Sequence, residues 1–139
     1  MFPEADPSLA ADKKDNLMLV YVYDDPAKNL PQSYEIFYTM WDGYQWSTPR
    51  PITDNYVTDV KPAVIYNSNG NAIAAWTTIN NQTLPENITD FSQIIRYGEI
   101  AYSIFNASTQ TWSQPELLTN NNVFDYTPTL AADQNGHVM

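Results

Sequence analysis

A twelve-residue segment occurs three times in this chain. PSLAADKKDNLM, from Pro7 to Met18, aligns without a gap with PTLAADQNGHVM, from Pro128 to Met139. PAVIYNSNGNAI, which begins at Pro62, is the third copy, so the spacings are 55 and 66 residues. Repetition at such a period indicates stacked units, each of which needs its neighbours to bury its apolar faces.

The second half of the unit also repeats. YEIFYTMWDGYQWSTPRPIT, from Tyr34 to Thr53, resembles GEIAYSIFNASTQTWSQPELLT, from Gly98 to Thr119. The alignment pairs Glu35 with Glu99, Ile36 with Ile100, Tyr38 with Tyr102, Trp46 with Trp112 and Asp59 with Asp125. It predicts one module over residues 1–139, with blade 1 at about 7–61, blade 2 at about 62–127 and the start of a third repeat at 128–139.

Each unit divides into four predicted strands. The first ends at an Asx/Gly-rich tip, KKDN, NSNG or QNGH, of the kind a tight hairpin needs. The second strand, LMLVYVY or AIAAWTT, is nearly all apolar, which predicts burial on both faces. The third is EIFYTMW or EIAYSIF, and a fourth begins at W-S-x-P, where a proline is tolerated mainly at a sheet edge. This pattern predicts an all-β fold of four-stranded antiparallel β-propeller blades.

Two blades are too few to close a propeller ring. Propellers contain about four to eight blades. The third copy stops at Met139, which aligns with Met18 inside a second strand. We therefore expect the ring to be completed by a homo-oligomer, preferably a trimer with six blades, or by neighbouring blades of a longer chain. The extra residues of blade 2, between Asn80 and Arg96, predict a polar loop on a face that binds.

Charge and composition exclude several partners. The net charge is −10 and the only arginines are Arg50 and Arg96, which excludes nucleic acid as a partner. No apolar run reaches the roughly 20 residues that span a bilayer, so we expect no membrane insertion. Three N-glycosylation patterns, at Asn81, Asn87 and Asn106, favour an extracellular or cell-surface location.

These motifs resemble the blades of the sialidase-like (BNR or Asp-box) β-propeller superfamily, and in layout those of six-bladed fucose-binding lectins. The resemblance rests on W-S-x-P, the following Leu/Ile-Thr, an aspartate and P-x-L-A-x-D-x-N-G. The Asp-box runs Ser/Thr-x-Asp-x-Gly-x-x-Trp. Residues 39–46, TMWDGYQW, keep its Thr, Gly and Trp, but Asp42 stands one place late.

The resemblance implies three arginines for a substrate carboxylate, a Tyr–Glu nucleophile pair and an acid/base aspartate. With only Arg50 and Arg96, this chain cannot build that site alone. Glycoside hydrolysis in general needs two carboxyl groups about 5–10 Å apart. Glu35 and Glu99 could face a shared cleft, but we favour the alternative that each carboxylate supports its own strand end by hydrogen bonds.

Carbohydrate binding needs an aromatic platform and a few polar groups. Candidates for such a site, at predicted strand ends and turns, are Glu35, Trp41, Tyr44, Arg96, Tyr97, Glu99 and Phe105. Three tryptophans at inner or repeated positions, Trp46, Trp76 and Trp112, are instead expected to pack between blades.

The chain offers little for a cofactor. Asp24, Asp25, Asp54, Asp59, Asp125 and Asp133 supply oxygen donors for a structural calcium, but none has the spacing of a known calcium loop. The single histidine, His137, falls at a predicted hairpin tip, so no histidine metal site or Ser-His-Asp triad can form within one chain. We predict no cofactor.

The sequence thus favours a non-catalytic binding or scaffold module of an extracellular propeller, with glycans as the ligand class. One alternative is a piece of a sialidase-like glycosidase whose catalytic residues lie on other blades. Another is a structural surface or adhesin repeat that binds protein.

Overall fold

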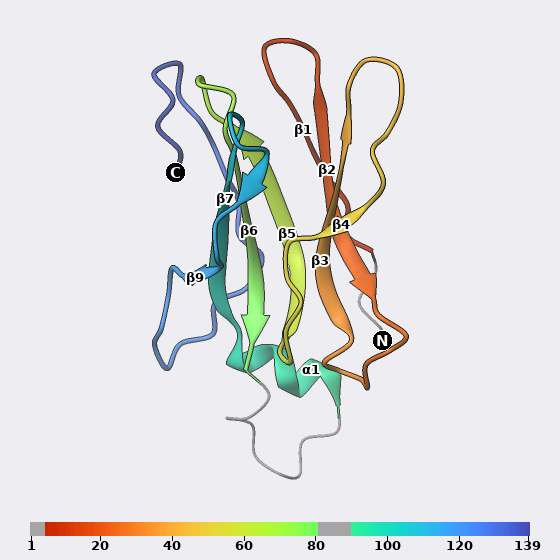
Figure 1. The fold of residues 1–139 in the computed structure, drawn as a ribbon. Coiled ribbons are helices and arrows are strands. Elements are labelled where there is room, and N and C mark those ends of the chain that lie inside the picture. The colour runs from red at the N-terminus through yellow and green to blue at the C-terminus, as the bar shows by residue number, and fades with distance from the viewer. Residues whose placement is uncertain (1–4, 81–89) are drawn as a thin grey trace.

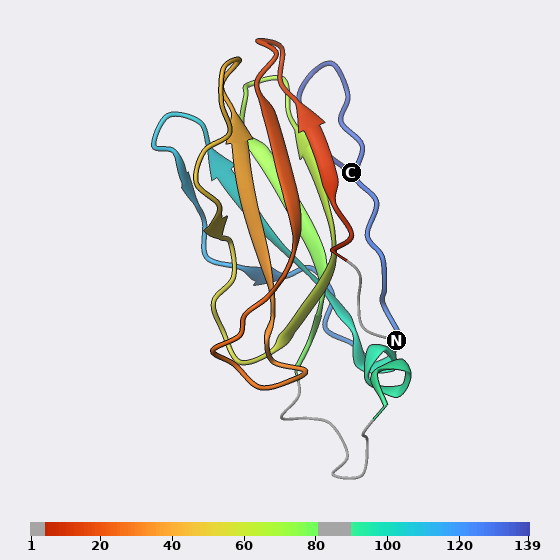
Figure 2. The same cartoon turned by 90° about the vertical axis from the view of Figure 1, so that its right-hand side faces the viewer.

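The computed structural model describes residues 5–80 and 90–139, and its fold is nearly all β. Two antiparallel sheets, here called sheet A and sheet B, pack face to face (Figures 1 and 2). The predicted all-β, blade-like fold is confirmed. The glycosylation patterns at Asn81 and Asn87 lie outside the described residues.

Sheet A is a four-stranded meander. Its strands β1 (Ser8–Ala11), β2 (Leu17–Asp24), β3 (Tyr34–Trp41) and β4 (Arg50–Pro51) follow one another in space as in sequence. Sheet B repeats the meander with β5 (Thr58–Tyr66), β6 (Ala72–Ile79), β7 (Glu99–Asn106) and β8 (Thr111–Trp112), while β9 (Glu116–Leu117) also pairs with β7. Strand β5 begins before Pro62 and contains a bulge between Val60 and Ala63.

The three hairpin tips share one hydrogen-bond scheme. The Oδ1 atom of Asp12 accepts from the backbone N–H groups of Lys14 at 2.7 Å and Asn16 at 2.9 Å. In the next copies, Asn67 and Asp133 accept from the N–H groups two and four residues on in the same way. An Asx residue at this position therefore closes each turn, and the third copy forms its hairpin as well, with a bridge between Ala132 and Val138.

Between β6 and β7 the structure departs from the predicted polar loop. A helical turn, α1 (Phe91–Ile94), continues into the 3-10 helix η2 (Ile95–Tyr97). Asp90 begins it as an N-cap, because its Oδ1 accepts the N–H of Ser92 at 3.0 Å. The buried side chain of Ile94, 6% exposed, anchors the turn, so this part of the segment folds because it carries an apolar residue.

The core lies between the two sheets. In β2, Met18, Val20 and Val22 are buried, and on sheet B the small residues Ala72 and Ala74 share one buried face of β6 with Trp76. Tyr38 of sheet A meets the Trp112 ring of sheet B edge-on, with ring centroids 5.5 Å apart. The two sheets therefore pack as neighbouring blades, each burying one face on the other.

Of the three tryptophans expected in the core, Trp46 is not there. Trp76 is 1% exposed and Trp112 is partly buried against the core, whereas Trp46 is 44% exposed. Trp46 and Trp112 are equivalent in the repeat. Sheet A covers Trp112 of sheet B, whereas no sheet among the described residues covers the face of sheet A that carries Trp46. Position in the array, and not position in the repeat, decides their burial.

Candidate functional site

Glu35, predicted as a ligand-binding residue, is almost fully buried, with 1% exposure. Its Oε2 accepts a hydrogen bond from the Thr53 hydroxyl at 2.5 Å. Its Oε1 accepts from the Asn55 N–H at 3.0 Å and from the Lys28 ammonium at 2.5 Å. Both carboxylate oxygens thus accept hydrogen bonds, from donors in the loop that follows β4 and in the β2–β3 loop.

Lys28 is the cation of this cluster. Its ammonium also donates to Asp54 Oδ1 at 2.6 Å and to the carbonyl oxygen of Asn55 at 2.9 Å. Partial burial by itself lowers the pKa of Lys28, but the hydrogen bonds and charges of Asp54 and Glu35 outweigh it and raise that pKa above its ordinary value. All three ammonium donors are used, so Lys28 is bound in place as a structural group.

Glu99 repeats most of this arrangement in blade 2. Its Oε2 accepts from the Thr119 hydroxyl at 2.7 Å, and its Oε1 accepts from the Asn121 N–H at 2.9 Å. Glu99 is half-buried and no described lysine faces it. Each glutamate ties its own strand end to the loop after the outer strand, which agrees with the structural alternative for this pair.

Asp59 extends the Glu35 cluster into the core. It is 1% exposed and accepts hydrogen bonds from the Trp76 indole N–H and from the Asn55 side-chain amide, both at 2.9 Å. Burial, together with the nearby charge of Glu35, raises the pKa of Asp59 to about 6 against the opposing hydrogen bonds. The Asn121–Asp125 hydrogen bond of 2.9 Å repeats the outer half of this link in blade 2.

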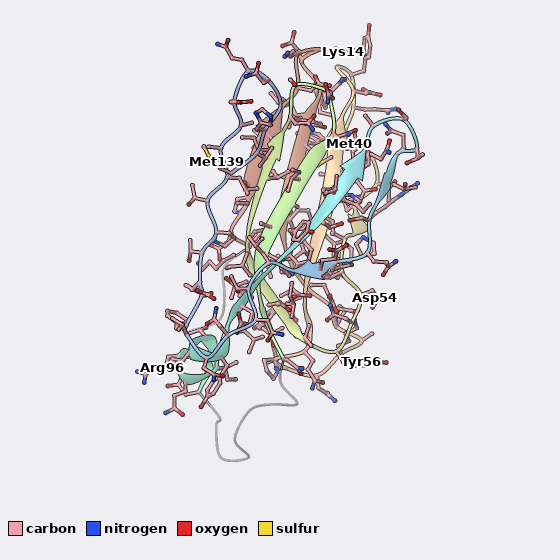
Figure 3. All side chains as sticks on the ribbon, turned by 90° about the vertical axis from the view of Figure 1, so that its left-hand side faces the viewer. Lys14, Met40, Asp54, Tyr56, Arg96 and Met139 are labelled. Atoms are coloured by element: carbon pink, nitrogen blue, oxygen red, sulfur yellow. The ribbon has the colours of Figure 1, made fainter. Side chains whose placement is uncertain are left out.

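Arg96 and Tyr97 belong to η2, which is separated from Glu99 by one residue. Both are exposed, Tyr97 by 44%, at the end of the molecule that also holds the Glu35 cluster (Figure 3). The structure therefore brings Arg96, Tyr97 and Glu99 to one end of sheet B.

Trp41 and Tyr44 lie at the opposite end, where β3 turns toward β4. The Trp41 and Trp46 rings are 5.7 Å apart, and Tyr44 is 91% exposed in a turn closed by Asp42, whose Oδ1 accepts the N–H groups of Tyr44 and Gln45. These hydrogen bonds from Gln45 and Tyr44 lower the pKa of Asp42. Asp42 thus shapes the turn although it stands one place late in the Asp-box.

Phe105, expected in an exposed platform, is a core residue. It is 1% exposed and packs against Trp112 and Tyr38, at centroid distances of 5.4 and 6.3 Å. The seven predicted residues therefore form no single site: they divide between two ends of the molecule and the core.

The structure instead forms a hollow between the blades, at the end that carries the hairpin tips. It has a volume of about 320 Å³ and lies between the β1–β2 tip of sheet A, the β5–β6 tip of sheet B and the β7–β8 turn. Lys14 and Met40 mark this end in Figure 3, far from Arg96. Phe105 and Met40 supply apolar walls, and the polar lining residues include Asp12, Asn16, Tyr66, Asn67, Asn69 and Gln110. We refer to it below as the interblade hollow.

Tyr66 is the polar group of the interblade hollow that most needs a partner. Its side chain is 8% exposed, and its hydroxyl is buried without a hydrogen-bond partner among the residues that the structure describes. Burial, aided by the charge of Asp12, raises the pKa of Tyr66 to about 12, so the hydroxyl is neutral at physiological pH. A buried hydroxyl without a partner costs free energy that a bound hydroxyl or water would recover.

Amide side chains line other parts of the same hollow. Gln110 donates from Nε2 to the carbonyl oxygen of Ala107 at 2.7 Å, and Asn71 accepts the Ala107 N–H at 3.0 Å, so the β7–β8 turn is fixed against the neighbouring tip. The sequence indicated each hairpin tip separately, but not that the β1–β2 and β5–β6 tips lie next to each other. The available signal was that KKDN and NSNG occupy the same repeat position in adjacent blades.

In residues 5–80 and 90–139, no group of three or more His, Cys, Asp or Glu side chains is placed to hold a metal ion, and no cofactor is indicated. No helix of the described chain is long and apolar enough to cross a membrane.

Comparison with known proteins places the fold. No protein-family model and no curated protein matches the sequence. Among solved structures, the chain is similar to the Hadza microbial sialidase Hz136, with a TM-score of 0.61 and 15% sequence identity over 81% of this chain. The match spans 25% of that sialidase. At this identity the likeness concerns the fold alone, and it supports a sialidase-like propeller fold; the layout shared with fucose-binding lectins has no support from these comparisons.

Proposed function

We propose that this chain is a non-catalytic carbohydrate-binding module of an extracellular or cell-surface propeller, and that the interblade hollow is its ligand site. The observation that carries the proposal is the buried Tyr66 hydroxyl, which has no partner within the described chain and belongs to a residue that lines a hollow of about 320 Å³. That volume is at the lower end of the range for small-molecule pockets and suits one or two sugar residues.

The lining of the hollow has the chemistry that sugars require. Met40 offers apolar surface for the C–H face of a pyranose, while Asn69 and Gln110 offer amide groups for its hydroxyls. Lys13 and Lys14 line the same hollow, and their positive charges suit a ligand with an acidic substituent. The Tyr66 hydroxyl would favour hydroxylated over apolar ligands, because an apolar ligand would leave this hydroxyl without a hydrogen bond, which costs binding free energy.

A piece of a sialidase-like glycosidase is the second candidate, and the structural likeness to a sialidase favours it. Against it, both oxygens of Glu35 already accept hydrogen bonds from Thr53, Asn55 and Lys28. A catalytic carboxyl group must instead face the substrate.

A glycan-array screen followed by calorimetric titration of the best ligand tests the proposal. Replacing Tyr66→Phe should weaken binding about fivefold, since one hydrogen bond is worth about 1 kcal/mol. Gln110→Ala, an exposed position, should weaken it by a similar factor. The matched control is Tyr102→Phe, whose hydroxyl bonds Glu116 at 3.0 Å and does not line the hollow.

Three results would contradict the proposal. A screen without any glycan ligand removes the ligand class, and a ligand insensitive to both Tyr66→Phe and Gln110→Ala lies elsewhere. Release of sugar from the ligand during the titration would favour the glycosidase.

A further inference from the structure

Sheet A has a second face that is apolar and open. This outer face of sheet A comprises Leu9, Leu17, Leu19, Tyr21, Phe37, Trp41 and Trp46. Leu9 is 58% and Trp46 44% exposed, and the remaining side chains are only half-buried. Aromatic rings contact one another along it: the Tyr21 and Phe37 centroids are 6.4 Å apart, with the ring planes tilted by 48°. A contiguous apolar surface of this kind marks an interaction site.

The repeat identifies what this face is built to meet. Its residues align with residues of sheet B that are already buried against sheet A: Leu9 with Val64, Leu17 with Ala72, Leu19 with Ala74, Tyr21 with Trp76, Trp41 with Phe105 and Trp46 with Trp112. In sheet B, Val64, Trp76 and Phe105 are 7%, 1% and 1% exposed. The outer face of sheet A is therefore a second copy of an interface half whose partner is known.

The complementary half is present on the outer face of sheet B. The residues of sheet A that cover sheet B include Met18, Tyr38 and Met40. Their repeat equivalents on sheet B are Ile73, Tyr102 and Ile104, which point away from sheet A and are half-buried or, for Ile104, 40% exposed. Each molecule thus carries both halves of the blade–blade interface on opposite outer faces.

We propose that the outer face of sheet A binds the outer face of sheet B of a second copy of this chain, and so repeats the contact already present within one molecule. The contact is head-to-tail, and such contacts close into rings when the rotation per copy allows it. Three copies supply six blades, which is within the range of four to eight.

One segment must move for this contact to form. Residues 128–139 are the repeat equivalent of residues 7–18, and they lie beside sheet B, where Gly136 approaches Ser68. Within the described chain, the hydrogen bonds of residues 128–139 stay inside that hairpin, as between Ala131 and Met139 at 2.8 Å. Strand β1, by contrast, pairs with β2 along its whole length. In the assembly, β1 of the incoming copy therefore takes this position and the hairpin is displaced.

Light scattering behind gel filtration, over a concentration series of the full chain, tests the proposal. We expect a concentration-dependent mass that rises from 15.8 kDa toward three times that value. Trp46→Lys and Ile104→Lys, both at exposed positions, should each give a monomer with an unchanged circular dichroism spectrum. The control Tyr44→Lys, 91% exposed and off the face, should assemble like the wild type.

Mixing the two variants gives the sharpest result. Trp46→Lys keeps the sheet B half and Ile104→Lys keeps the sheet A half, so an equimolar mixture should form a dimer of twice the chain mass and nothing larger. A wild-type chain that stays monomeric at about 0.5 mM, well above the dissociation constant of a specific interface, overturns the proposal. So does assembly of either variant alone, or a mixture that remains monomeric.

Discussion

Glu35 and Glu99 are the same residue of the repeat in two environments. Glu35 is buried and meets an ammonium group, whereas Glu99 is half-buried and holds only the hydroxyl and N–H partners. Removing one partner of a buried ion pair leaves the other charge uncompensated, which is far more costly than losing an exposed hydrogen bond.

Substitution by the neutral isostere separates the two cases. Glu35→Gln should lower the free energy of unfolding by about 3 kcal/mol, and Glu99→Gln by about 1 kcal/mol. Urea denaturation at pH 7 measures both. Equal losses at the two positions would mean that Lys28 adds nothing to the cluster.

Asp59 makes stability depend on pH. Its pKa is about 6 in the folded protein, above the ordinary value of 3.8, so the folded state holds this proton more tightly than the unfolded state. The contribution is complete below about pH 4 and is lost as the pH rises through 6, which amounts to about 3 kcal/mol. Asp59→Asn cannot titrate and should lack this component.

Chemical denaturation of the wild type and Asp59→Asn at several pH values between 4 and 7 gives the comparison. The wild type should lose stability relative to the variant as the pH rises across this range. Parallel curves would show that Asp59 is ionised in the folded state throughout.

At the scale of elements, one serine holds each outer strand. The Ser47 hydroxyl accepts the Met40 N–H at 3.0 Å, and Ser113 does the same for Ile104 at 3.0 Å. The serine of W-S-x-P thus replaces a ladder hydrogen bond close to the proline that cannot donate one.

Ser113→Ala should therefore cost about 1 kcal/mol of stability and Ser47→Ala a similar amount. Hydrogen exchange of the Ile104 and Met40 amides, measured by NMR, should accelerate in the matching variant only. Unchanged protection of both amides would contradict a role of the hydroxyl in the ladder.

The strands themselves could be predicted well from the sequence. LMLVYVY and EIFYTMW correspond to β2 and β3, because hydrophobic pattern and turn residues act locally and recur in each copy. The helical turn at 91–97 was missed, since the repeat offers no second copy of it.

The candidate site could be predicted less well. Burial of Phe105 and exposure of Trp46 depend on which faces a neighbouring blade covers, and that is a property of the array, not of the repeat unit. The interblade hollow arises from two tips about 55 residues apart in sequence, so no local pattern contains it.

At the scale of the whole molecule, the two sheets are held together by blade packing. Trp112 is enclosed between the sheets, while its repeat equivalent Trp46 lies on the open face. Trp112→Ala should lower the free energy of unfolding by about 3 kcal/mol or more, and Trp46→Ala by less than about 1 kcal/mol in dilute solution, where the outer face is free. Urea denaturation at low micromolar concentration provides the test, and a larger loss for Trp46→Ala would reverse the assignment of covered and open faces.

The most direct test of this packing is the nuclear Overhauser effect between the rings of Tyr38 and Trp112. These residues belong to different sheets, and their ring centroids lie 5.5 Å apart only if sheet A packs on sheet B as described. We predict cross-peaks between the Tyr38 ring protons and the Trp112 indole. Their absence, with both spin systems assigned, would contradict the two-blade arrangement from which both the interblade hollow and the open outer faces follow.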